Sequence, residues 1–154
     1  MTGSPATPAG TGIKLDVEGA VATITLCRPE RHNAMTPAMW HGLAAIGGSL
    51  PPHVRAVVVR GAGPSFSAGI DLRLFSAEGV PDSERLADPL SPGFDDWLAG
   101  CQAGFLWLRR PDIVSVAAVH GHATGAGFRH ALACDLRVLA DAMLCMKEPV
   151  LTAR

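Results

Sequence analysis

Two glycine-bearing segments place small residues where another molecule can come close to the polypeptide backbone. The first, "SFSAGIDLRLF" at 65–75, has Ala68 and Gly69, with Asp71 two positions after the glycine. The second is "HGHATGAGFRHALACDLRV" at 120–138. Both follow apolar runs and precede helical patterns, and free N–H groups at a helix start favour negative charge. We therefore predict that the two segments are halves of one site that stabilises an anion.

Each segment alone also fits an ordinary strand-to-helix connection. Asp71 could serve only to brace its turn by accepting backbone N–H groups. Gly125 and Gly127 would also permit close packing of a helix on a strand. Neither segment matches G-x-G-x-x-G or G-x-x-x-x-G-K-[ST], so dinucleotide-binding and P-loop interpretations are disfavoured.

Other catalytic and metal-binding patterns are weak. Ser65 and Ser67 do not form G-x-S-x-G, which disfavours a serine nucleophile. His120 and His122 lie two apart with no third ligand in sequence, so we predict no metal site. The four cysteines are far apart and form no C-x-x-C pair, which favours reduced thiols in a cytoplasmic protein.

Glu148 lies in "CMKEPV", after an apolar run. A carboxylate beside apolar residues can have a raised pKa and then act as an acid or a base. A surface glutamate is the commoner explanation of such a residue.

Strand and helix patterns alternate along the chain, which predicts an α/β domain with right-handed crossovers. Thr36 and Pro37 have the types of a helix cap and first helical residue, and Gly47 with Gly48 would end that helix. The remaining expected elements are a hairpin at 13–26, a strand buried on both faces at 55–63, a surface loop at 76–93, a helix at 93–110, strands at 113–119 and 136–140, and a short helix at 127–134.

Length and composition fit a single core domain at 13–154 behind a disordered tail at 1–12. The chain has 154 residues, is 48% hydrophobic and has a net charge of −1, so a nucleic-acid-binding face is not expected. No apolar run reaches the roughly 18 residues needed to span a membrane, and the first residues lack the pattern of a secretory signal. Basic charge is almost wholly arginine, which suggests a bacterial source.

Taken together, three segments resemble the enoyl-CoA hydratase/isomerase (crotonase) family. "ATITLCRPERHNAM" resembles its early strand and R-P-x-x-x-N-A loop. "VVVRGAGPSFSAGIDLRLF" resembles G-x-G-x-x-F-x-A-G-x-D-L, and "IVSVAAVHGHATGAGFRHALACDLRVLA" resembles the family's second glycine-rich signature. The resemblance covers about residues 21–148.

The resemblance implies a crotonase-like (ClpP/crotonase) spiral of ββα units and a substrate carried as an acyl-CoA thioester, as in fatty acid metabolism. Two backbone N–H groups would form an oxyanion hole for the thioester enolate, and the matching amides are those of Ala68 and Ala126. No resident cofactor is implied, because CoA is part of the substrate. A homo-oligomer, a trimer or hexamer, is expected, with no nucleic-acid or membrane partner.

The resemblance also implies residues that hold the substrate. The loop around Arg31, His32 and Ala34 matches the part of the family that holds the CoA adenine and phosphates, where Arg28 and Arg31 add positive charge. The remaining substrate or CoA contacts are expected from residues of the two glycine-bearing segments: Ser67, Gly69, Ile70, Asp71 and Gly125.

Two departures bear on activity. Hydratases of this family use two glutamates, and one of those positions is Arg129 here, while Glu148 matches the other. Because arginine cannot act as a base at neutral pH, this argues against simple hydration and towards an isomerase with a single carboxylate. The C-terminal helical part of the family is also expected to be missing, which would leave apolar surface exposed.

Three functions therefore remain open. The first is an enoyl-CoA hydratase or Δ3,Δ2-enoyl-CoA isomerase with Glu148 as the acid/base. The second is a non-catalytic acyl-CoA-binding protein or a truncated, inactive relative. The third is thioester hydrolysis or another reaction on the same scaffold.

Overall fold

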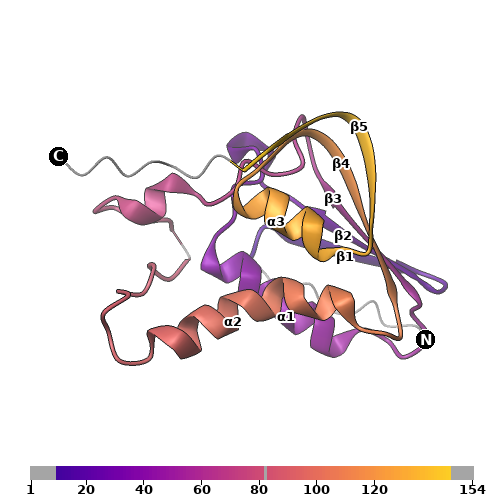
Figure 1. Cartoon of the computed structure of the whole chain (residues 1–154), viewed down its shortest axis with the longest axis horizontal. Coiled ribbons are helices and arrows are strands. Elements are labelled where there is room, and N and C mark those ends of the chain that lie inside the picture. Colours follow the sequence, from indigo (N-terminus) through magenta and orange to yellow (C-terminus); the bar gives the residue numbers. More distant parts are fainter. Residues whose placement is uncertain (1–9, 82, 147–154) are drawn as a thin grey trace.

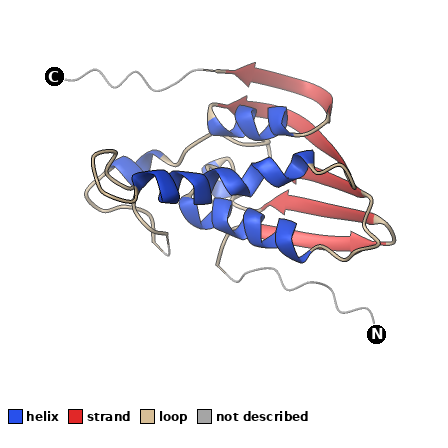
Figure 2. Cartoon of the chain, turned by 60° about the horizontal axis from the view of Figure 1, so that its bottom comes forward, coloured by secondary structure: helices blue, strands red, loops and turns tan. Residues whose placement is uncertain are grey.

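A computed structural model describes residues 10–81 and 83–146, and shows a five-stranded sheet with its α-helices on one side (Figure 1 and Figure 2). The strands lie in chain order across the sheet. They are β1 (Ile13–Glu18), β2 (Val21–Leu26), β3 (Ala56–Gly61), β4 (Val114–Thr124) and β5 (Leu136–Cys145). This mixed α/β fold confirms the predicted fold class. No helix in the described ranges combines the length and the hydrophobicity that crossing a membrane requires.

The first two strands form the predicted hairpin. β1 pairs antiparallel with β2, from Ile13 opposite Leu26 to Glu18 opposite Val21, and Gly19 takes a positive φ of 54° in the turn. The fold begins before β1, because the Gly12 carbonyl accepts a hydrogen bond from the Cys27 N–H at 2.7 Å. The prediction of a disordered tail is therefore wrong for residues 10–12, and residues 1–9 lie outside the described part.

The strands from β2 to β5 run parallel to one another. The connections contain α1 (Pro37–Ser49), α2 (Phe94–Leu106) and α3 (Ala126–Ala133), besides the short 3-10 helices η1 (Pro29–Arg31), η2 (Leu72–Phe75) and η3 (Trp107–Arg109). Parallel strands have their carboxyl ends at one edge of the sheet, where ligands bind in open α/β folds. The predicted glycine-bearing segments follow β3 and end β4, so the fold brings both to this edge.

Helix α1 begins as predicted but ends later. The Thr36 side chain accepts from the Met39 N–H at 3.3 Å, and Pro37 is the first helical residue. The helix continues through Gly47 and Gly48 to Ser49, so the predicted stop is wrong. A Cβ on Gly47 would lie 2.5 Å from the Trp107 ring, which shows that this glycine provides close packing rather than a helix end.

The core lies between the sheet and the helices. It is built from alternate residues of the strands and from one face of α1, with α2 pressed so closely on α1 that a Cβ on Gly104 would lie 2.5 Å from the Trp40 carbonyl oxygen. The fully buried large side chains include Ile24, Leu26, Met39, Leu43, Val57, Val59, Leu108 and Val119.

The last strands are longer and more exposed than predicted. β4 continues through "HGHAT" after a register shift at His120/Gly121, so residues expected to form a turn are paired with β5. A Cβ on Gly121 would lie 2.1 Å from the Pro64 carbonyl oxygen. Nearly every residue of β5 is exposed.

β3 is not buried on both faces, contrary to the prediction. Arg60 is exposed, so one face of this strand is partly exposed.

Candidate functional site

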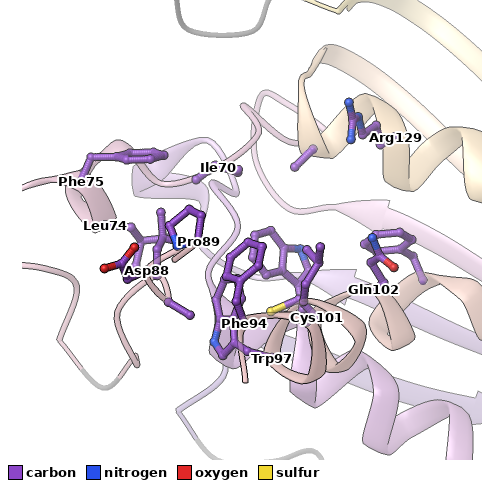
Figure 3. A pocket seen from close by; sticks show the side chains of 16 residues that line it. Ile70, Leu74, Phe75, Asp88, Pro89, Phe94, Trp97, Cys101, Gln102 and Arg129 are labelled. Carbon is purple, nitrogen blue, oxygen red and sulfur yellow. The ribbon is translucent and has the colours of Figure 1, made fainter. Parts of the chain in front are cut away.

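An apolar pocket of about 610 Å³ lies at the edge of the sheet, between η2, the 86–89 loop, α2 and the start of α3 (Figure 3). Its size lies in the range typical of small-molecule sites. Its walls are mostly aliphatic and aromatic side chains, and the lining residues that α2 contributes are Phe94, Trp97, Leu98, Cys101, Gln102 and Phe105.

One glutamate ties the loop beside the pocket to two helices. The Glu84 carboxylate accepts a hydrogen bond from the Trp97 indole N–H at 3.2 Å and lies 2.7 Å from the His41 ring. Trp97 in turn stacks on Phe94, with ring centroids 6.0 Å apart. The aromatic wall of the pocket is therefore fixed from behind by polar contacts. Burial in this wall, and secondarily the charge of Glu84, raises the pKa of the Cys101 thiol to about 11.

Asp71 braces the first glycine-bearing segment, as the sequence suggested. Its carboxylate accepts from the Arg73 guanidinium at 2.8 Å and 3.0 Å, from the Arg28 guanidinium at 2.9 Å, and from the Arg73 N–H at 3.2 Å. The hydrogen bonds from Arg73, and next those from Arg28, outweigh burial and hold the pKa of Asp71 well below its usual range. Asp71 is thus a buried, ionised brace at the start of η2.

Ser67 is also a brace rather than a pocket residue. It is fully buried, its hydroxyl donates to the Asn33 carbonyl at 2.8 Å, and the same oxygen accepts from the Gly69 N–H at 3.2 Å. Asn33 is fully buried as well, and its side chain donates to the Ala62 and Ser65 carbonyls at 2.8 Å each. The predicted substrate contact by Ser67 is therefore wrong, because both partners of its hydroxyl lie within the chain.

The Ala68 N–H, which was predicted to be an oxyanion-hole donor, is not available for that role. Its N–H donates to the His32 carbonyl at 2.8 Å, so it is already occupied. The amide of Ile70 is differently placed. Residues 35 and 70 form an isolated parallel bridge, in which Met35 N–H donates to the Gly69 carbonyl and Asp71 N–H to the Met35 carbonyl. In such a bridge Ile70 directs its own N–H away from Met35.

The second predicted amide is available. The Ala126 N–H is at the first position of α3, where it has no carbonyl one turn earlier within the helix. Within the ranges 10–81 and 83–146, neither the Ile70 N–H nor the Ala126 N–H has a hydrogen-bond acceptor. Both residues line the pocket.

Main-chain contacts hold these two segments against each other. Ser67 and Ala123 form an isolated parallel bridge, with Ser67 N–H donating to the His122 carbonyl at 2.9 Å and Thr124 N–H to the Ser67 carbonyl at 3.0 Å. A Cβ on Gly69 would lie 2.7 Å from the Thr124 carbonyl oxygen and 3.5 Å from the Ala126 nitrogen. The prediction that the two segments form one site is consistent with this contact.

Glycines make this approach possible. Gly69 has a φ of 93°, and a Cβ on Gly127 would lie 2.6 Å from the Ser67 Cβ. Gly125 caps α3 with a positive φ of 51°, and its N–H donates to the Cys145 carbonyl at 3.0 Å. The role of these three glycines is therefore to let the two segments come close together. The Gly125 N–H already has an acceptor within the chain.

The residues predicted to hold CoA divide into two groups. Arg31 and His32 are exposed, and His32 takes a left-handed conformation after η1. Arg28 is nearly buried and donates to both the Ala34 carbonyl and Asp71, so its charge is used within the fold. Ala34 is buried. The predicted acid/base Glu148 lies outside the described residues.

Sequence reasoning missed the aromatic wall and Asn33. The wall residues of α2 show only helical periodicity, which does not distinguish a core face from a pocket face. Asn33 takes a positive φ of 54°, which is several-fold more common for asparagine than for most residues, and that residue type was the available signal. In the described ranges no group of three or more His, Cys, Asp or Glu is arranged to hold a metal ion.

The comparisons with known proteins point to one family. The family model described as enoyl-CoA hydratase/isomerase matches residues 16–149. A Mycobacterium tuberculosis protein named as a probable enoyl-CoA hydratase is 39% identical over 86% of this chain and 48% of its own length. The mouse mitochondrial Delta(3,5)-Delta(2,4)-dienoyl-CoA isomerase is 34% identical over 83% of this chain and 40% of its own length.

A solved structure agrees with these relatives. The crystal structure of a Thermobifida fusca YX protein assigned as an enoyl-CoA hydratase, in complex with acetoacetyl-CoA, matches with a TM-score of 0.89 and 54% identity, over 96% of this chain and 59% of that one. The chain spans about half the length of the curated relatives it matches. The matched family model, the fold and the paired glycine-bearing segments together show that the chain belongs to the enoyl-CoA hydratase/isomerase family.

Proposed function

We propose that the protein binds acyl-CoA thioesters and that the main-chain N–H groups of Ile70 and Ala126 hold the thioester oxygen while it gains negative charge. One observation carries this proposal: two amides without an acceptor in the described residues come from abutting segments on the wall of one pocket. Fixed amides stabilise a developing enolate without reorganising, and each such donor contributes about 3 kcal/mol to the transition state. Ile70 replaces Ala68 in this role.

The pocket would receive the acyl chain. Its aromatic and aliphatic walls favour hydrocarbon (Figure 3), and Ile70 and Ala126, where the thioester would lie, are among the residues that line it. The acetoacetyl-CoA complex of the Thermobifida fusca protein, which is 54% identical, supports this class of ligand. Arg31 and His32, both exposed on the loop before α1, would meet the CoA phosphates.

The reaction that suits this chain best is proton transfer between carbons of the acyl group. Arg129 stands where hydratases of the family have one of two glutamates, and the remaining candidate is Glu148. One carboxylate can remove a proton from one carbon and return it to another, moving the double bond without adding water. Isomerisation is therefore our first proposal, and hydration our second.

We also propose the pathway, cofactor requirement and assembly that the family resemblance implies. The protein would act in fatty acid metabolism in the cytoplasm, would need no resident cofactor, and would assemble as a trimer or hexamer. The exposed apolar side chains of β5, among them Leu136, Val138 and Met143, support burial of this strand in a larger assembly.

The oxyanion proposal is tested by Ala126→Pro with Ala126→Ser as its control. Proline is tolerated at the first helical position, so the first change removes one N–H with little effect on α3, while serine keeps the N–H. With a 3-enoyl-CoA substrate, Ala126→Pro should lower kcat about 100-fold or more and Ala126→Ser only a few-fold.

A spectroscopic measurement tests directly whether the thioester carbonyl is polarised on binding, which a steric effect of the proline substitution would not show. The infrared carbonyl stretch of crotonyl-CoA labelled with carbon-13 at the thioester carbon should fall in frequency on binding to the unaltered protein. If CoA esters bind with no shift in that stretch, the two amides do not hold the oxygen and the proposal fails.

A non-catalytic acyl-CoA-binding protein is the second candidate, and Arg129 is the observation that favours it. Calorimetric binding of crotonyl-CoA and of a 3-enoyl-CoA without turnover of either would support this candidate over the enzyme. Turnover that is lost in Glu148→Gln while CoA binding persists would exclude it.

A further inference from the structure

Aromatic side chains are concentrated at the pocket. The chain has five Phe, three Trp and no Tyr, and five of these eight aromatic residues line the pocket. They are Trp40, Phe75, Phe94, Trp97 and Phe105. Aliphatic side chains would favour a straight hydrocarbon chain equally well, because the hydrophobic effect depends on apolar area and not on ring structure. The enrichment therefore points to a ligand that gains from rings in particular.

Most of these aromatic side chains keep surface that a ligand can contact. Trp40 is part of the core, with 6% of its surface exposed, but Phe75 is 50% exposed. Phe94, Trp97 and Phe105 are half-buried. Burial of the remaining ring surface against a bound acyl group would add apolar contact that the described chain alone lacks.

The aromatic residues of α2 lie at opposite ends of that helix. Phe105 is at the end near α3, because its ring meets the His130 ring edge-on, with centroids 6.2 Å apart. Phe94 is the first residue of α2 and precedes Phe105 by about three helical turns. Phe94 and Trp97 therefore lie toward the end of α2 that is away from α3, the helix that carries the proposed oxyanion donor Ala126.

We refer to Phe75, Phe94 and Trp97 as the aromatic end of the pocket, and Figure 3 shows these side chains apart from Arg129 of α3. Phe94 and Trp97 stack with an angle of 26° between their planes, and the Trp97 indole N–H donates to the Glu84 carboxylate at 3.2 Å. A ring of a ligand can stack on such a pair or meet it edge to face. Each aromatic pair gains binding energy beyond the area that it buries.

We propose that the aromatic end binds a phenyl ring, and that the protein acts on acyl-CoA esters whose acyl chain ends in an aromatic ring. This inference rests on the proposed function, because it needs the thioester at Ile70 and Ala126. It agrees with the apolar walls of the pocket, since an unsubstituted ring is hydrocarbon. It also agrees with the proposed double-bond shift, which involves carbons between the thioester and the ring and leaves the ring unchanged.

Acyl-CoA esters of equal carbon number test this selectivity. 4-Phenylbutanoyl-CoA and 6-phenylhexanoyl-CoA place the ring at two distances from the thioester. Each is compared with its cyclohexyl counterpart and with the straight-chain ester, decanoyl-CoA or dodecanoyl-CoA. All are saturated, so calorimetry measures binding without a double-bond shift, and free CoA is the reference ligand.

The unaltered chain should bind at least one phenyl ester more tightly than its cyclohexyl and straight-chain partners, by about fivefold or more. The reason is that a single aromatic pair contributes about two- to twelvefold in affinity beyond the area it buries. The cyclohexyl ester has nearly the same shape and apolar area, so the comparison isolates the aromatic contribution.

Two variants of Trp97 separate the ring from its hydrogen bond. Trp97→Leu and Trp97→Phe both remove the indole N–H that donates to Glu84, but only leucine removes the ring. Trp97→Leu should lower the phenyl preference by about twofold or more, and Trp97→Phe should keep it. Phe94→Leu should act like Trp97→Leu. Phe128→Leu, the same change at a residue of α3 that is not among those lining the pocket, should leave the preference unaltered, and thermal unfolding checks that each variant is folded.

Two results overturn the inference. One is that neither phenyl ester binds more tightly than its cyclohexyl and straight-chain partners, which would make this a pocket for hydrocarbon in general. The other is a phenyl preference that persists undiminished in both Trp97→Leu and Phe94→Leu. Failure of the underlying function looks different, because then no ester of the set binds more tightly than free CoA.

Discussion

His130 makes the stability of the protein depend on pH, and its replacement should remove that dependence. The side chain on α3 is 1% exposed, and neither ring nitrogen has a hydrogen-bond partner in the described residues. The Phe105 ring meets it edge-on, with centroids 6.2 Å apart. Burial lowers the pKa of His130 from 6.5 to about 4, because the imidazolium would lose its hydration without gaining a partner.

The sign follows from which state binds the proton. Below pH 6.5 the unfolded chain takes up a proton that the folded chain refuses until about pH 4, so stability falls as the pH is lowered through this window. The full effect is about 3 kcal/mol, and about 2 kcal/mol of it is already lost at pH 5. Above pH 6.5 both states hold the ring neutral and the effect is absent.

The perturbation is His130→Leu, which replaces an unpartnered ring by a hydrocarbon of similar size. Its free energy of unfolding in urea should differ little from that of the unaltered chain at pH 8, or be higher. At pH 5 the variant should be more stable than the unaltered chain by about 2 kcal/mol. His53→Gln, which removes an exposed histidine after α1, should leave the difference between the two pH values unchanged.

The comparison between pH values makes the reasoning testable even if the substitution alters packing. A packing change shifts the stability at both pH values together, whereas loss of the titrating group shifts only the value at pH 5. If the unaltered chain and His130→Leu lose the same stability between pH 8 and pH 5, His130 is not the buried neutral group described above.

Two further predictions concern how the pocket edge is held. Asp71→Asn should destabilise the chain by about 3 kcal/mol in urea unfolding, since it leaves the nearly buried Arg28 without its carboxylate. Because the pKa of Asp71 is lower in the folded chain than in the unfolded chain, the stability due to this pair should be complete above about pH 4 and should fade as the pH falls further, so equal acid sensitivity of the variant and the unaltered chain would contradict it. Gly127→Ala should weaken acyl-CoA binding and lower the melting temperature, because its Cβ would lie 2.6 Å from Ser67. Gly48→Ala, where nothing lies within 4 Å of the added atom, should instead stabilise by about 1 kcal/mol, and the argument fails if the two changes act alike.

The sequence allowed much of the fold to be predicted because its local signals agree with one another. The hairpin, the Thr36 cap and the strand-turn-helix order were all readable from residue types and periodicity. The predictions failed where packing decides. Gly47 resembles a helix end in sequence and is a contact for Trp107 in the structure. β4 continues through "HGHAT" because this segment pairs with the end of β5.

The site was predictable as a pair of segments but not to the level of single atoms. The His32 carbonyl and the bridge to Met35 decide which N–H group of residues 68–70 faces the pocket. Both contacts come from a distant part of the sequence, so no local sequence pattern predicts them. Ser67 and Asp71 have the residue types of ligand-binding groups, yet their partners are other parts of the chain. Polar residues beside glycines therefore indicated the region and not the individual roles.

The bridges Met35–Ile70 and Ser67–Ala123 consist of backbone groups alone, so side-chain replacement at positions other than the closely packed Gly69 and Gly127 leaves their hydrogen bonds intact. The backbone frame of the proposed site is therefore independent of most of the side chains that line the pocket. A substitution at position 129 changes a side chain of α3, whereas the proposed donors are backbone groups. Substrate preference can thus change through side-chain replacement alone, and a laboratory selection that varies the side chains of the pocket would test whether the backbone donors keep working.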